Sequence, residues 1–185
     1  MKFFEHSALV GQHAFLSASN YHWLNYDLEK LSERYLRHLA VQRGTDLHDL
    51  ACRCIKLRVR MPRNHQTLNQ YVNDALGYDM TPEQVLYFSS NCFGTADAIC
   101  FRDDYLRIHD LKTGEGDTSM RQLEIYAALF CLEYHYDPEK LKGIELRIYQ
   151  NDEVRIENPS PVEIRRIMET IIAFDKQLEE LKSRE

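Results

Sequence analysis

Two aspartates and a lysine, Asp97, Asp110 and Lys112, are the residues whose types and spacing could support chemistry. Two apolar-rich runs lie between the aspartates and flank a polar turn at 102–104, which is the pattern of a β-hairpin. A hairpin brings Asp97 close to Asp110, and carboxylates that close repel unless a hard cation such as Mg²⁺ or Mn²⁺ lies between them. Lys112 projects from the same face of the strand as Asp110. This set suits phosphodiester hydrolysis, because it offers metal ligands and a cation beside the attacking water.

Four motifs, in order and at fitting spacing, resemble those of the RecB-like branch of the PD-(D/E)XK nuclease superfamily. They are the GxxxH motif at Gly44 to His48, the aspartate Asp97, the run Asp110-Leu111-Lys112 with aspartate in the D/E position, and the QxxxY motif at Gln122 to Tyr126. The run at 15–19 resembles the short serine-rich opening before the first helix of that branch. The resemblance covers most of the chain and implies a restriction-endonuclease-like core.

The resemblance also implies roles for the site residues. His48, Asp97 and Asp110 would hold the metal together with the backbone carbonyl of Leu111, and Lys112 would stabilise the nucleophile or the developing charge. Gln122 would reach toward the metal and Tyr126 toward the DNA backbone.

Simpler interpretations exist for the same residues. His48 alone fits a partly buried histidine with an ordinary hydrogen bond, and Asp97 fits a turn aspartate after small residues. Asp110 and Lys112 fit charges at a strand end. Gln122 and Tyr126, spaced i, i+4, fit a polar stripe on one helix face.

The cysteines argue against an iron–sulfur cluster. Members of this branch that carry one use one cysteine before the GxxxH helix and three after the QxxxY helix, whereas here none precedes Cys52 and none follows Cys131. We therefore expect Mg²⁺ or Mn²⁺ and no iron–sulfur cluster. The five cysteines form no plausible disulfide framework, so reduced thiols are expected. Cys52 and Cys54 fit buried small apolar side chains better than metal ligands.

Composition predicts a globular protein. With 185 residues, 44% of them hydrophobic and 28% charged, the chain can form one sizeable core. We expect a single nuclease domain over 1–185, with a helical N-terminal part to about 77 and a catalytic core over about 84–185. No apolar run reaches about 18 residues, and 1–6 turns polar too early for a signal peptide. A soluble cytoplasmic protein without a membrane partner is expected, in the host cytoplasm if it is viral.

Periodicity predicts an α/β fold with a small mixed sheet flanked by helices. The expected elements are helices over 17–41, 44–58 and 66–76, a turn at 81–83, a strand over 85–88, a hairpin over 95–112, a loop over 113–117, a helix over 118–134, a second hairpin over 141–157, and a final helix after 159–161.

The charge distribution points to a nucleic-acid partner more than the net charge does. The net charge of −6 argues mildly against DNA, because phosphate neutralisation drives such binding. Between 50 and 73, however, no acidic residue interrupts a basic stretch. It consists of Arg53, Lys56, Arg58, Arg60 and Arg63. This basic stretch is either a track for DNA or a solvated face.

We therefore expect a stand-alone, metal-dependent DNA nuclease, of the compact kind that serves phages in DNA end processing or recombination. An exonuclease is favoured because no segment is left over for base readout. A non-catalytic DNA-end-binding or assembly subunit and a purely structural helical partner are the alternatives. A recombination or replication protein is a candidate partner, and the broad apolar face of the final helix suggests a homo-oligomer.

Overall fold

The structure is a computed structural model in which residues 14–184 are described. The expectation drawn from 1–6 lies outside the described residues. The chain divides into two compact units, Met1–Thr45 and Asp46–Glu185, and each is described here by itself. The single domain over 1–185 stays a prediction.

The first unit contains the 3₁₀ helix η2 (Ala18–Asn25) and the first part of α1 (Leu28–Lys56). Helix α1 continues through Gly44, so the predicted start of a second helix at 44 is wrong. One glycine costs a helix interior only about 1 kcal/mol relative to alanine, which the packing of Ala51 and Ile55 of the same helix in the core offsets. The region predicted as helix over 17–41 begins as 3₁₀ turns and becomes α-helical only at Leu28.

The second unit is built on one five-stranded sheet with the strand order β1-β2-β3-β4-β5. Its elements after α1 are α2 (Thr67–Gly77), β1 (Thr81–Ser89), β2 (Cys92–Arg102), β3 (Tyr105–Leu111), α3 (Arg121–Glu133), the 3₁₀ turn η3 (Pro138–Lys140), β4 (Gly143–Gln150), β5 (Glu153–Glu157) and α4 (Pro161–Lys182). Strands β3 and β4 are parallel, whereas the other pairs are antiparallel. A parallel pair needs a crossover, which α3 supplies. The predicted α/β class, with a small mixed sheet flanked by helices, is confirmed.

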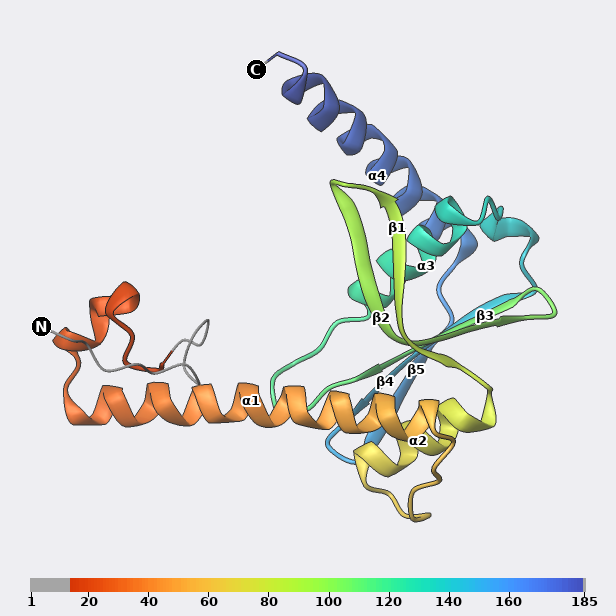
Figure 1. Ribbon diagram of the computed structural model, residues 1–185. Helices are drawn as coiled ribbons and strands as arrows, with labels where there is room; N and C mark the ends of the chain where they lie inside the picture. The colour runs from red at the N-terminus through yellow and green to blue at the C-terminus, as the bar shows by residue number, and fades with distance from the viewer. Residues whose placement is uncertain (1–13, 185) are drawn as a thin grey trace, which may run out of the picture. The chain divides into compact units, whose positions relative to one another are not determined.

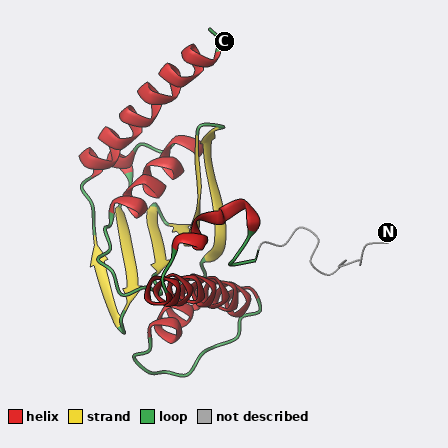
Figure 2. Ribbon diagram, turned by 90° about the vertical axis from the view of Figure 1, so that its left-hand side faces the viewer, coloured by secondary structure: helices red, strands yellow, loops and turns green. Residues whose placement is uncertain are grey.

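Helices cover both faces of this sheet (Figure 1). Helices α3 and α4 lie over one face, where Leu106, Ile108 and Leu146 are fully buried against them. Helix α2 lies over the other face together with the last turns of α1, which contribute Ala51 and Ile55 to a second apolar cluster. Figure 2 shows the strands between these helical layers. The core is therefore two apolar layers separated by the sheet.

Turn residues fix both predicted hairpins. Asp103 and Asp104 join β2 to β3 with φ angles of 53° and 64°, and Asn151 and Asp152 join β4 to β5 with 51° and 61°. Two-residue turns with positive φ match the twist of antiparallel strands, and Asn and Asp tolerate that conformation. The final helix is also confirmed, because the Ser160 side chain caps it.

Strand β1 begins earlier than the sequence predicts. Residues 81–83, expected to form a turn, belong to the strand. Proline is tolerated in a strand at the edge of a sheet, and β1 is such a strand. The next residue, Glu83, has a φ of 52°, which interrupts the regular strand geometry there.

Helix α4 divides into two parts. Ile164 is fully buried, and Ile167, Met168 and Ile171 pack on the core beside α3. Beyond them Phe174 is 67% exposed, and the helix extends past the sheet (Figure 1). No helix within residues 14–184 is both long and apolar enough to cross a membrane.

Candidate metal centre

The candidate site lies where strands β2 and β3 separate. Their last paired residues are Ala98 and His109, and the next residues along the two strands are Asp97 and Asp110. The backbone N–H of Leu111 donates a hydrogen bond of 2.9 Å to Asp97 Oδ2 across this opening. The hairpin therefore brings the two aspartates to adjacent positions, as the sequence predicts.

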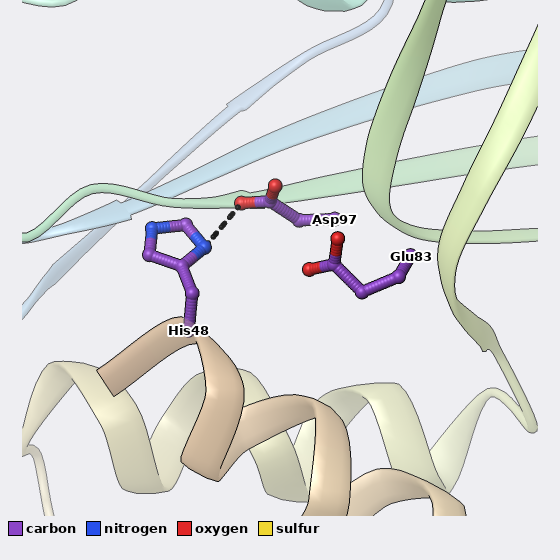
Figure 3. Close-up of side chains that lie close together, drawn as sticks. All are labelled: His48, Glu83 and Asp97. Carbon is purple, nitrogen blue, oxygen red and sulfur yellow. Dashed lines mark ion pairs between the residues drawn. The ribbon is translucent and has the colours of Figure 1, made fainter. Parts of the chain in front are cut away.

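Three side chains converge beside this opening (Figure 3). One potential ligand atom from each of His48, Glu83 and Asp97 lies within 4.8 Å of the other two. His48 comes from α1, and its Nδ1 is 3.4 Å from Asp97 Oδ2. Ligands of one Mg²⁺-sized ion, at about 2.1 Å, are at most about 4.2 Å apart, so small side-chain movements would let these atoms share an ion. Two carboxylates and an imidazole suit Mn²⁺ in particular, because imidazole is a softer ligand than Mg²⁺ prefers.

Glu83 is the member of this cluster that the sequence analysis missed. The β1–β2 register pairs Pro82 with Ala98 and Gln84 with Ala96, so Glu83 lies across from Asp97. In a hairpin centred on Ser90, Glu83 and Asp97 are equally far from the turn and therefore lie opposite each other. This relation in the sequence could have identified Glu83 as a neighbour of Asp97.

Electrostatics supports a cation at this place. Burial first, and then the negative charge of Asp110, raise the pKa of the Asp97 carboxyl to about 6. The Leu111 N–H and His48 lower this pKa and Glu83 raises it, but none of them cancels the main effect. A divalent cation would remove the repulsion, which gives the cluster a physical reason to bind one.

Asp110 contacts the lysine that the sequence placed beside it. Lys112 Nζ donates a hydrogen bond of 3.1 Å to Asp110 Oδ1. The same ammonium lies 2.9 Å from Oδ2, yet this buried oxygen accepts no hydrogen bond with normal geometry from the described residues. A buried carboxylate oxygen that accepts no hydrogen bond is stabilised by nearby positive charge, here that of Lys112, so the donor set fits a metal beside the lysine.

The QxxxY residues continue the contacts of Lys112. Gln122 Oε1 accepts a hydrogen bond of 2.8 Å from Lys112 Nζ, and its amide nitrogen donates one of 3.0 Å to the Tyr126 hydroxyl. Because the Tyr126 hydroxyl accepts this bond, its own proton remains free for donation. Gln122 therefore positions the lysine as well as the tyrosine.

Gly94 makes room for the Tyr126 ring. A Cβ atom added at Gly94 would lie 2.8 Å from Tyr126 Cε1, which is closer than carbon atoms approach without displacement. The small residue on β2 thus sets how deeply the tyrosine of α3 packs against the sheet.

Tyr71 of α2 is a second residue that sequence reasoning missed. It is 2% exposed, packs edge-on against Tyr149, and forms no side-chain hydrogen bond within the described residues. Burial, followed by the charges of Asp97 and Asp110, holds its pKa well above the usual range for tyrosine. Its neutral hydroxyl therefore lies in the field of the same carboxylates. No local pattern marks it, because it looks like an ordinary core residue of α2.

The basic stretch lies on the end of α1 and the loop before α2. All five of its side chains are exposed. Arg58 forms an ion pair with Asp79, which reduces the charge it offers to a ligand. Arg53, Arg60 and Arg63 form no ion pair with any described residue.

The carbonyl of Leu111 as a metal ligand stays a prediction.

Comparison with protein families gives a match over the second unit. The family model described as "Protein of unknown function (DUF2800)" matches residues 80–176. The matched segment includes Glu83, Asp97, Lys112 and Tyr126 but starts after His48. Neither a curated protein nor a solved structure matches the chain. The match spans just over half of the chain, and the protein therefore belongs to the DUF2800 family.

Proposed function

We propose that this protein is a metal-dependent nuclease that hydrolyses phosphodiester bonds in DNA, with an exonuclease as the favoured form. The observation that carries the proposal is the juxtaposition of His48, Glu83 and Asp97 with the ion pair between the buried Asp110 and the partly exposed Lys112. Such a group of side chains could hold a cation with a lysine beside it, and it fits the resemblance to RecB-like nucleases. The same resemblance supports a role in end processing or recombination, alongside a recombination or replication partner.

Mg²⁺ or Mn²⁺, held by His48, Glu83 and Asp97 with Asp110 at its side, would act as a Lewis acid on the phosphate and lower the pKa of water. Asp110 and Gln122 fix the Lys112 ammonium, which stabilises negative charge that develops on the phosphate oxygens.

The Tyr126 hydroxyl donates its free proton to a phosphate oxygen of the bound strand and so orients it. Gln122 links this hydroxyl to Lys112. The Gln122 side chain therefore sets the distance between the hydroxyl that contacts the DNA and the Lys112 ammonium.

Purified protein incubated with linear and with circular DNA tests the proposal. We expect degradation of linear DNA in Mn²⁺, a slower reaction in Mg²⁺, and none in EDTA, since the imidazole ligand favours Mn²⁺. Degradation of linear DNA alone supports an exonuclease, and cleavage of both forms supports an endonuclease. Metal-dependent binding to DNA ends without products would instead assign a non-catalytic end binder. No interaction with either DNA would leave a structural role.

The basic stretch supports DNA as the ligand. Replacing Arg53, Arg60 and Arg63 with alanine should weaken DNA binding and lower the slope of log K against log salt concentration by roughly one unit per lost phosphate contact. Fluorescence anisotropy at several salt concentrations measures this slope.

A matched control removes positive charge elsewhere. Lys140 of η3 and Lys176 of α4, which are exposed and form no ion pair with any described residue, can be replaced with alanine in the same assay, and the slope should then stay at its parent value. An unchanged slope in the triple variant would place the DNA on another surface.

A homo-oligomer remains part of this proposal. The exposed end of α4, with Phe174 and Leu178, offers apolar surface that the sheet does not cover. Light scattering at several protein concentrations distinguishes an oligomer from a single chain.

A further inference from the structure

A small pocket of about 190 Å³ lies directly beside the candidate metal centre. Four parts of the second unit form its walls: α1, the start of α2, the segment that follows β3, and the β4–β5 turn. The lining residues are Leu47, Thr67, Leu68, Leu111, Lys112, Thr113 and Asn151. Two of them are sequence neighbours of residues in the metal centre, because Leu47 precedes His48 and Leu111 follows Asp110.

The pocket has stiff walls. Asp152 Oδ1 accepts hydrogen bonds from the Thr67 backbone N–H at 2.8 Å and from its hydroxyl at 3.1 Å, while the Asp152 N–H donates to Thr67 Oγ1 at 2.7 Å. These bonds cap α2 and attach the β4–β5 turn to it. On the opposite side, Gln150 donates to the carbonyls of Gly114 and Gly116, which orders the loop after Lys112. The cavity is therefore preformed rather than a gap between independent loops.

The chemistry of the lining favours a neutral group with apolar faces and a polar edge. Leu47, Leu68 and Leu111 provide apolar surface, and Lys112, already bound to Asp110 and Gln122, is the only charged side chain among the lining residues. At the rim, the Thr113 hydroxyl and the Asn151 amide make no side-chain hydrogen bond with the described residues and can donate or accept. Apolar faces with a polar edge are the properties of a nucleobase. The volume lies well below the roughly 300–1,000 Å³ of sites for drug-sized ligands, which suits one ring system.

We infer that this pocket binds one unstacked nucleobase of the substrate, the base of the nucleotide whose phosphate lies at the metal centre. The inference rests on the proposed nuclease function and adds a subsite to it. An enzyme that holds this base must separate it from its neighbour, and an end or a single strand makes that separation least costly. The pocket thus favours terminal or single-stranded nucleotides as the substrate of the site.

Binding of two small probes in Mn²⁺ tests the pocket without requiring cleavage. The probes are thymidine 5′-monophosphate, which has the base, and 2-deoxyribose 5-phosphate, which lacks it. Calorimetry should show binding of both, with the nucleotide roughly tenfold tighter, because burying one base against three leucines adds apolar contact. Equal affinities for the two probes would contradict the binding of a base in the pocket and would leave the nuclease proposal standing. Binding of neither probe would also overturn the base-binding role of the pocket, while the cleavage assay with linear DNA decides the nuclease proposal.

Leu47→Trp is the variant that fills the pocket, and Leu50→Trp is its matched control on the same helix. Leu47 is 37% exposed and Leu50 is 44% exposed, so both accept a larger ring, but only Leu47 lines the cavity. In Leu47→Trp the affinity ratio of the two probes should fall to about one, whereas Leu50→Trp should keep the tenfold ratio. Leu68→Phe, which narrows the cavity from α2, should lower the ratio as well. An unchanged ratio in folded Leu47→Trp, checked by circular dichroism, would contradict the assignment.

Discussion

Replacing Lys112 with alanine is expected to lower the rate of DNA cleavage by about 10²- to 10³-fold while metal binding is retained. The Lys112 ammonium touches Asp110 and Gln122, so it is held beside the carboxylates without being a metal ligand. In the proposed reaction, its removal would take away a fixed positive charge at the place where the phosphate would develop negative charge. Single-turnover cleavage measures the rate, and calorimetry with Mn²⁺ measures the metal affinity.

Lys142→Ala provides the control for this variant. Lys142 also lies close to an aspartate, with its Nζ 3.6 Å from Asp104 Oδ2, but it precedes β4 at the far end of the sheet. This control should cut DNA at the parent rate. A Lys112→Ala protein that cleaves as fast as the parent would show that the lysine has no part in the reaction.

Replacing Asp97 with asparagine is expected to have two opposite effects. Metal affinity should fall by at least about 100-fold, because a charged ligand is lost from the centre of the cluster. The metal-free protein should become more stable, since asparagine can still accept the Leu111 N–H without carrying the buried charge. Thermal unfolding in EDTA and in Mn²⁺ separates the effects: the variant should melt higher in EDTA and gain little from Mn²⁺.

The pH dependence of this stabilisation follows from the raised pKa of Asp97. Its carboxyl has a pKa of about 6 in the folded protein, against the ordinary value of 3.8. Between these values the folded state holds more protons than the unfolded state, so stability falls as pH rises, and the full cost of about 1–3 kcal/mol is present above pH 6. The advantage of Asp97→Asn in EDTA should therefore vanish below about pH 4.

Asp103→Asn is the matched control, because Asp103 lies at the other end of β2–β3 in an exposed turn with a positive φ that asparagine also tolerates. It should change neither metal affinity nor the pH profile. An Asp97→Asn protein that melts below the parent in EDTA at neutral pH would contradict the repulsion assigned to the aspartates.

Several local features were determined by the sequence itself. The turns at Asp103-Asp104 and Asn151-Asp152 form because these residue types adopt positive φ at low cost, so both hairpins could be predicted. The hairpin then brings Asp97 to Asp110, and the two-residue strand spacing places Lys112 against Asp110. Serine and proline at 160–161 start α4 for equally local reasons. All of these depend on contacts between residues close in the chain.

The tertiary structure decided the rest. Helix α1 continues through Gly44 because its last turns are stabilised by packing of Ala51 and Ile55 in the core, and β1 includes Pro82 because the strand has a free edge. Glu83 enters the candidate metal cluster only through its pairing across from Asp97, and His48 reaches it from α1. The pocket beside Lys112 likewise needs four segments that are distant in sequence. Such contacts depend on how the elements pack, and local residue preferences carry no information about them.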